Sequence, residues 1–288
     1  MAMTRAAFLL ALLTLAGCAA PRGAAPSAVS GRGRGGPADP HVPLFATEPF
    51  QPFSRQAAIA IALREWRLFG QNVDDDPPNT RPPPLPQDKP ERMPGLWQRV
   101  GEYWWIGMDP DSREVAWTGK HDGAGVVFPA SIDGDYAWSA AFISYVMRIA
   151  AAGPRFPYAA AHSEYIDAAF SGGTALRPQR PESYAPQPGD LICESRTPRL
   201  MRFDDLPAGR FPAHCAIVVQ AAPQLLTVVG GNVDDAVTVT HVPTTPAGAL
   251  AWPDGTVVDT RYPWFVVLQV LYDIDRAPEE AAPVASAR

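Results

Sequence analysis

The order of its hydrophobic patterns is the feature that most constrains the fold of this chain. Up to about residue 187, apolar side chains recur every three or four positions along several stretches, which is typical of amphipathic helices. From residue 188 the pattern changes to short runs rich in Val, Ile, Leu and Thr, separated by turn-forming residues, as in antiparallel strands. This order indicates the α+β class, with the helices packed on one face of a sheet.

The clearest predicted helix begins at Ser54, a good N-cap residue, and ends before Gly70. Its buried face is expected to carry Ile59, Leu63 and Trp66. A proline-rich stretch after it is predicted to be an extended surface segment. The other predicted helices lie around 95–105, from Ser139 to about 150 and over 161–170, and the strands over 188–194, 214–220, 225–230, 236–242 and 264–273.

The N-terminus has the pattern of an export signal. Residues 1–17 contain one positive charge, Arg5, followed by about ten apolar residues, which are too few to span a bilayer. The junction at Cys18 is similar to a bacterial lipobox, so we expect a lipid on this cysteine after cleavage. Residues 18–45 are rich in Gly, Pro, Ala and Ser and predict a flexible tether. We therefore expect a lipoprotein at the periplasmic face of a bacterial membrane, with the outer membrane favoured.

The remaining chain is predicted to form one domain. Residues 46–129 are its helical and proline-rich part, residues 130–276 its core and residues 277–288 a disordered tail. Hydrophobic residues make up 47% of the chain, which is ample for a core, and the net charge of -6 gives no electrostatic footprint for nucleic acid. Because no phosphate-binding glycine loop and no zinc-ligand spacing is present, we expect no cofactor.

Two cysteines of the predicted strands, Cys193 and Cys215, can form a disulfide in an oxidising compartment or remain buried free thiols. Cys215 is a poor candidate for a nucleophile, because its neighbour His214 would point to the opposite face of the same strand.

Ser139 is the most informative polar residue, because it stands where an apolar helix begins. It can act as a nucleophile, as a helix cap, or as a substitute for a lost nucleophile. His214 at the start of a strand can be a catalytic base or a satisfied core histidine, and Asn232 in "GGN" can orient that histidine or serve only in a turn.

The succession of "WSAAFISYVM", "PxPGD", a strand that starts with His214, and "GGN" resembles the CHAP amidases and NlpC-type cell-wall peptidases of the papain-like class. The same motifs and "EYWW" are similar to a bacterial family of exported proteins known as domain of unknown function 2272. The resemblance implies a papain-like fold in which Ser139 takes the position of the catalytic cysteine, His214 is the base and Asn232 orients it. Gly230 stands where CHAP enzymes often have a glutamate.

Three further residues are expected to line the cleft: Trp138, Asp135 and His162. His162 can equally be a helix-face histidine that bonds a neighbour. Some CHAP enzymes hold calcium with aspartates upstream of the nucleophile, but Asp133 and Asp135 are too few ligands to specify such a site, and ordinary turn formation accounts for them. We expect no metal.

Two functions therefore remain open. The first is a cell-envelope hydrolase that cuts an amide of the peptidoglycan peptide through Ser139, His214 and Asn232. The second is a lipid-anchored protein that binds or scaffolds peptidoglycan or an envelope peptide with an inactive cleft. A serine nucleophile also suits an envelope esterase, although the G-x-S-x-G motif of common esterases is absent.

Overall fold

The computed structural model describes residues 52–272 except 79, 81 and 83. Within these residues it is an α+β fold in which four α-helices precede or flank an antiparallel sheet of six strands. The predicted signal, Cys18, the tether and the tail beyond residue 276 lie outside the described residues. In the described part, no helix combines the length and apolar character needed to cross a membrane.

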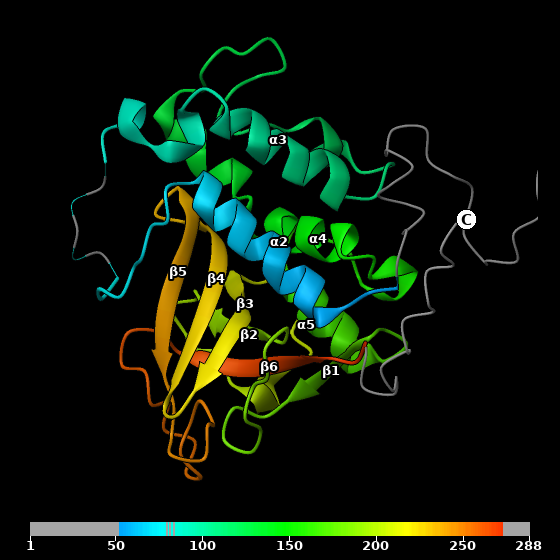
Figure 1. Cartoon of the computed structure of the whole chain (residues 1–288), viewed down its shortest axis with the longest axis vertical. Coiled ribbons are helices and arrows are strands. Elements are labelled where there is room, and N and C mark those ends of the chain that lie inside the picture. Colours follow the sequence, from blue (N-terminus) through cyan, green and yellow to red (C-terminus); the bar gives the residue numbers. More distant parts are fainter. Residues whose placement is uncertain (1–51, 79, 81, 83, 273–288) are drawn as a thin grey trace, which may run out of the picture. The chain divides into compact units, whose positions relative to one another are not determined.

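The helices form two layers above the sheet (Figure 1), with α2 and α4 against the strands and α3 outside them. Their bounds are α2 Arg55–Leu68, α3 Leu96–Gly107, α4 Ser139–Ile149 and α5 His162–Ser171. Short 3₁₀ helices occur at Pro86–Asp88, Pro90–Arg92, Arg113–Ala116, Ala130–Tyr136, Gly153–Arg155 and Phe203–Asp205.

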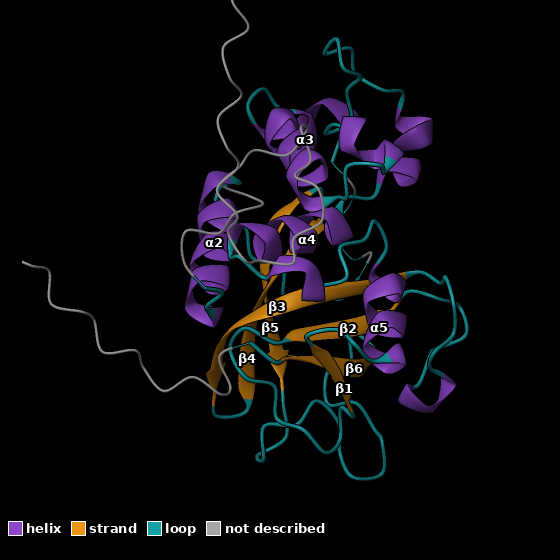
Figure 2. Ribbon diagram, turned by 90° about the vertical axis from the view of Figure 1, so that its right-hand side faces the viewer, coloured by secondary structure: helices purple, strands orange, loops and turns teal. Residues whose placement is uncertain are grey.

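The sheet has the order β1-β6-β2-β3-β4-β5, and every neighbouring pair is antiparallel. All the helices labelled in Figure 2 lie on one side of the sheet, as predicted. The other face carries a smaller apolar cluster covered by loops. The strands are β1 Leu176–Gln179, β2 Leu191–Ser195, β3 Ala213–Ala222, β4 Leu225–Val233, β5 Ala236–Pro243 and β6 Trp264–Val270.

Helix α2 begins as predicted, because the side chain of Ser54 accepts a hydrogen bond from the N–H of Ala57 at 2.9 Å. The prediction of its buried face is correct only in part. Leu63 and Trp66 pack against the core as half-buried residues, but the fully buried residues of the helix are Ala58, Ala62 and Glu65. The two alanines allow the helix backbone to approach its neighbours closely, and partners on α3 neutralise the buried carboxylate.

Glu65 is the centre of a buried polar network. Its side chain is fully buried and receives hydrogen bonds from Arg99 Nε (2.6 Å), Arg99 Nη2 (2.7 Å), the Tyr103 hydroxyl (2.8 Å) and Arg64 Nη2 (2.8 Å). Burial alone raises the pKa of a carboxyl group, but the hydrogen bonds and charge of Arg99 outweigh it and hold the pKa of Glu65 below its usual value. The network fastens α2 to α3.

Candidate functional site

Ser139 is the first residue of α4, and Trp138 occupies the N-cap position without a side-chain cap hydrogen bond. The capping role considered for Ser139 is therefore not the one it has. Its side chain is free to bond elsewhere, and only 8% of the residue is exposed. The first N–H groups of a helix have no partner within the helix, so the serine hydroxyl lies beside backbone donors.

The partner of Ser139 is His162, the first residue of α5. The Ser139 Oγ and His162 Nε2 atoms are 2.9 Å apart, which is hydrogen-bond distance. Two helix N-termini thus meet at a serine and a histidine. The interpretation of His162 as a residue that bonds a neighbour is correct, and that neighbour is the candidate nucleophile.

His214 does not pair with Ser139 in the way that the sequence suggested. In the described part of the chain, no hydrogen bond joins them. Cys215 packs in the core beneath the helices, whereas His214, near the start of β3, lines a small recess beside Gly230. Its ring still lies next to that of His162, with the ring centroids 5.3 Å apart and the planes nearly perpendicular.

Gly230 leaves room for the His214 ring. A methyl group at position 230 would lie 2.7 Å from His214 Nε2 and 3.0 Å from a methyl carbon of Val233. A glutamate therefore cannot fit at this position without displacing the imidazole. His214 and Gly230 line a small recess of about 20 Å³, together with the buried carboxylate of Glu194, which is directly opposite His214 on β2.

Both histidines are neutral at physiological pH. Burial, assisted by the charge of Arg196, lowers the pKa of His162 to about 3. Burial, Arg196 and His162 lower the pKa of His214 well below its usual value. The Nδ1 atom of each ring is buried and has no hydrogen-bond partner. A neutral His162 can accept a proton from Ser139, but no group among the described residues fixes its tautomer through Nδ1.

The third predicted catalytic residue, Asn232, lies near the end of β4 with a positive φ of 57°. No hydrogen bond joins it to His214 among the described residues, so the predicted orienting contact is not found. Asn232 instead lines an open groove of about 780 Å³. Its wall on the α4 side is formed by Asp133, Gly134 and Ala137, just upstream of Ser139.

The other predicted cleft residues have different positions. Trp138 is fully buried, and its indole N–H donates to Glu91 Oε2 at 2.6 Å, so it does not line an open cleft. Asp135 is exposed. Asp133 pairs with Arg92 and Lys89, which makes it a structural residue. Within the described residues, no group of three or more His, Cys, Asp or Glu side chains is arranged to hold a metal ion.

Cys193 and Cys215 are joined by a disulfide between directly opposed positions of β2 and β3. The bond is fully buried and ties together the strands that carry Glu194 and His214.

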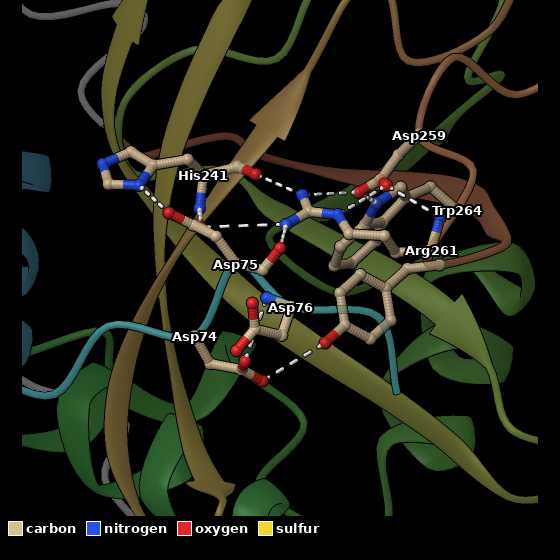
Figure 3. Close-up of polar contacts among 8 residues, drawn as sticks. Asp74, Asp75, Asp76, His241, Asp259, Arg261 and Trp264 are labelled. Carbon is tan, nitrogen blue, oxygen red and sulfur yellow. Dashed lines mark hydrogen bonds and ion pairs between the residues drawn. The ribbon is translucent and has the colours of Figure 1, made fainter. Parts of the chain in front are cut away.

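The proline-rich segment forms the outer wall of the groove. Asp74, Asp76, Pro77, Pro78 and Pro84 all line it. Figure 3 shows how Arg261 anchors this segment: its guanidinium donates to the backbone oxygen of Asp75 at 2.7 Å and pairs with Asp259 at 2.9 Å, while Asp75 also pairs with His241. The wall is therefore held by the hydrogen bond of Arg261 to the Asp75 backbone and by the hydrogen bond between Asp75 and His241.

Glu91 and Glu194 were missed by the sequence analysis. Glu194 interrupts an apolar strand pattern in "DLICES", and a charge inside such a run is a signal that could have identified it. Glu91 lies in a proline-rich stretch, where nothing in the local pattern indicates complete burial.

The family described as an uncharacterized protein conserved in bacteria (DUF2272) matches residues 91–270, which include the serine, both histidines, the disulfide and part of the groove. None of the curated proteins matches the chain, and no solved structure matches it.

Proposed function

Because the chain belongs to the DUF2272 family of uncharacterized bacterial proteins, whose description names no activity, we propose its function from its own side chains. The protein is a cell-envelope hydrolase in which Ser139 is the nucleophile and His162 the general base. The observation that carries this proposal is the 2.9 Å contact between Ser139 Oγ and His162 Nε2 at the start of α4. The resemblance to CHAP and NlpC-type papain-like enzymes agrees with a nucleophile at a helix N-terminus.

The geometry supports acyl transfer. Ser139 Oγ attacks a carbonyl carbon while its proton moves to His162 Nε2, and backbone N–H groups at the start of α4 stabilise the oxyanion. His162 then gives the proton to the leaving nitrogen, and the C–N bond breaks. A water molecule hydrolyses the acyl-enzyme by the reverse use of the same base. The substrate we propose is an amide of the peptidoglycan peptide, bound along the groove.

The location belongs to the same proposal. A signal at 1–17 and lipidation of Cys18 would hold the protein at the periplasmic face of a membrane, with residues 18–45 as the tether that lets it reach the peptidoglycan.

The alternative is a lipid-anchored peptidoglycan-binding or scaffolding protein without catalysis. Two observations favour it: Ser139 is only 8% exposed, and within residues 52–272, apart from 79, 81 and 83, the Nδ1 atom of His162 has no partner that would orient the ring. The groove remains available for binding in this case.

The experiment uses a soluble fragment that starts after Cys18 and purified peptidoglycan. We expect new amine or peptide termini to appear with wild type and with Ser171→Ala, a control on the exposed end of α5. Ser139→Ala and His162→Ala should abolish the release. If wild type and Ser139→Ala bind peptidoglycan equally and neither releases termini, the binding function replaces the hydrolase.

A further inference from the structure

The segment Lys89–Arg92, which we call the clasp, joins the two sides of the groove. Lys89 Nζ lies 3.2 Å from Asp133 on the α4 side and 3.0 Å from Asp235 in the β4–β5 turn. Arg92 also pairs with Asp133 and donates to the backbone oxygen of Phe128 at 2.8 Å. The clasp therefore holds the approach to α4 against the turn that follows Asn232.

Glu91 is the buried centre of the clasp. Its backbone N–H donates to the backbone oxygen of Asp235 at 3.1 Å, and its Oε2 accepts the indole N–H of Trp138 at 2.6 Å. Trp138 immediately precedes Ser139 and is the N-cap residue of α4. Glu91 thus contacts both the start of the nucleophile helix and the opposite wall of the groove.

The surroundings of this carboxyl group are unusual for a purely structural contact. Glu91 is fully buried, and its Oε1 accepts no hydrogen bond from any residue that the structure describes. Its closest cation is Lys120, also buried, with Nζ 3.8 Å from Oε1. Lys120 in turn donates to the backbone oxygens of Asp133 and Tyr136, the residues that lead into α4. A buried carboxylate of this kind is costly unless it is paired, so charge on Glu91 affects every group that faces it.

We infer that Glu91 is a positioning residue of the Ser139 site, which fixes the start of α4 through Trp138 and couples it to the groove wall at Asp235. The inference rests on the proposed function, because a nucleophile and its oxyanion donors must be held to within a fraction of an ångström. Burial raises the pKa of Glu91 to about 7, while Lys120 opposes that rise and Asp235 adds to it. Lys89 and Arg92, which pair with Asp133, are the other charged groups of the clasp. As Glu91 gains or loses its proton near neutral pH, the group that accepts the Trp138 N–H changes between a carboxylate and a neutral carboxyl group.

The test uses Ser139→Cys as the parent, because a thiol reports on the geometry of the site without a natural substrate. At a helix N-terminus, with the neutral His162 at hydrogen-bond distance to take its proton, this thiol should react with iodoacetamide faster than a free cysteine near neutral pH. Adding Glu91→Gln should slow the alkylation about fivefold or more at pH 8, where Glu91 is ionised, and flatten its pH profile around 7. Asp111→Asn, an exposed carboxylate on the surface, is the matched control and should leave the rate unchanged.

A second variant and a second measurement keep the test decisive. Trp138→Phe removes the indole N–H and should slow the alkylation in the same way. The difference in fluorescence between wild type and Trp138→Phe should titrate near pH 7, and Glu91→Gln should abolish that titration. Equal alkylation rates in Glu91→Gln and Asp111→Asn, with native circular dichroism, overturn the inference. A parent thiol no faster than free cysteine refutes the proposed function instead, and the fluorescence titration then decides whether Glu91 controls Trp138.

Discussion

Replacing Glu65 should show how strongly the buried network holds the helical layers together. Its carboxylate receives four hydrogen bonds of 2.6 to 2.8 Å, three of them from guanidinium groups. Each hydrogen bond to a charged group contributes about 1.5–3 kcal/mol, but the bonds are not additive. Removing one partner of a buried ion pair costs about 3–5 kcal/mol, and we expect this loss for Glu65→Ala. Because a domain is stabilised by only about 5–15 kcal/mol, the variant should be close to unfolding.

The assay is urea unfolding of the fragment that starts after Cys18, followed by circular dichroism. Glu65→Gln keeps the side-chain volume, removes the charge and replaces one acceptor oxygen with an NH2 donor. Glu102→Gln is the matched control, because Glu102 pairs with the same Arg99 but has a side chain 45% exposed, and it should cost less than about 1 kcal/mol. A Glu65→Gln variant that loses no more stability than Glu102→Gln would refute the reasoning.

The pH dependence provides an independent check. The pKa of Glu65 is lower in the folded chain than in the unfolded chain, so its stabilisation is present above the unfolded pKa of about 4.3 and is lost as the pH falls through the folded pKa. The difference in unfolding free energy between wild type and Glu65→Gln should therefore shrink on acidification. A difference that grows below pH 4 contradicts the assignment.

Three further predictions concern packing, the disulfide and the base. Gly107→Ala should lose about 1–3 kcal/mol of unfolding free energy, because the new methyl group would lie 2.7 Å from the backbone oxygen of Ala141. Gly101→Ala in the same helix, where the closest neighbour would be at 3.7 Å, should be neutral or stabilising. Equal effects of the two substitutions would disprove close α3–α4 contact. Replacing both Cys193 and Cys215 by Ala should lower the free energy of unfolding by about 3 kcal/mol, the loop-entropy value for a separation of 22 residues. A variant that is as stable as wild type in urea unfolding would contradict this value. If His162 is the base, kcat/KM for peptidoglycan cleavage should stay level from pH 8 down to about pH 5. The reason is that the ring accepts a proton only when it is neutral, and the pKa of His162 is about 3. A fall in kcat/KM centred on pH 6.5 would exclude a buried His162 as the base.

The secondary structure of this chain could be predicted well where local patterns decide it. Ser54 caps α2, and the predicted strands over 188–194 and 214–220 correspond to β2 and β3. Strand β1 was not predicted, because its sequence LRPQ contains a proline and few apolar residues. It lies at the edge of the sheet, where a proline is tolerated.

The site was predicted less well, because its contacts depend on how distant elements pack. Ser139 was identified from its place before an apolar helix, but its hydrogen-bond partner begins a different helix, 23 residues later. Nothing local to His162 indicates that the start of α5 meets the start of α4. The resemblance pointed to His214, whose ring lies beside that of His162 but makes no hydrogen bond to Ser139 among the described residues.

Helix α2 precedes the region matched by the family, which begins at residue 91, and this has a practical consequence for anyone who expresses the domain. A fragment trimmed to 91–270 would lack Arg55, which pairs with the buried Asp190 at 2.8 Å, and Glu65, which neutralises Arg99. It would retain the buried Asp190 without its cation, Arg99 without its buried partner Glu65, and a bare apolar surface over β3 and α4. Such a fragment should aggregate, and the shortest soluble version should start upstream of Ser54.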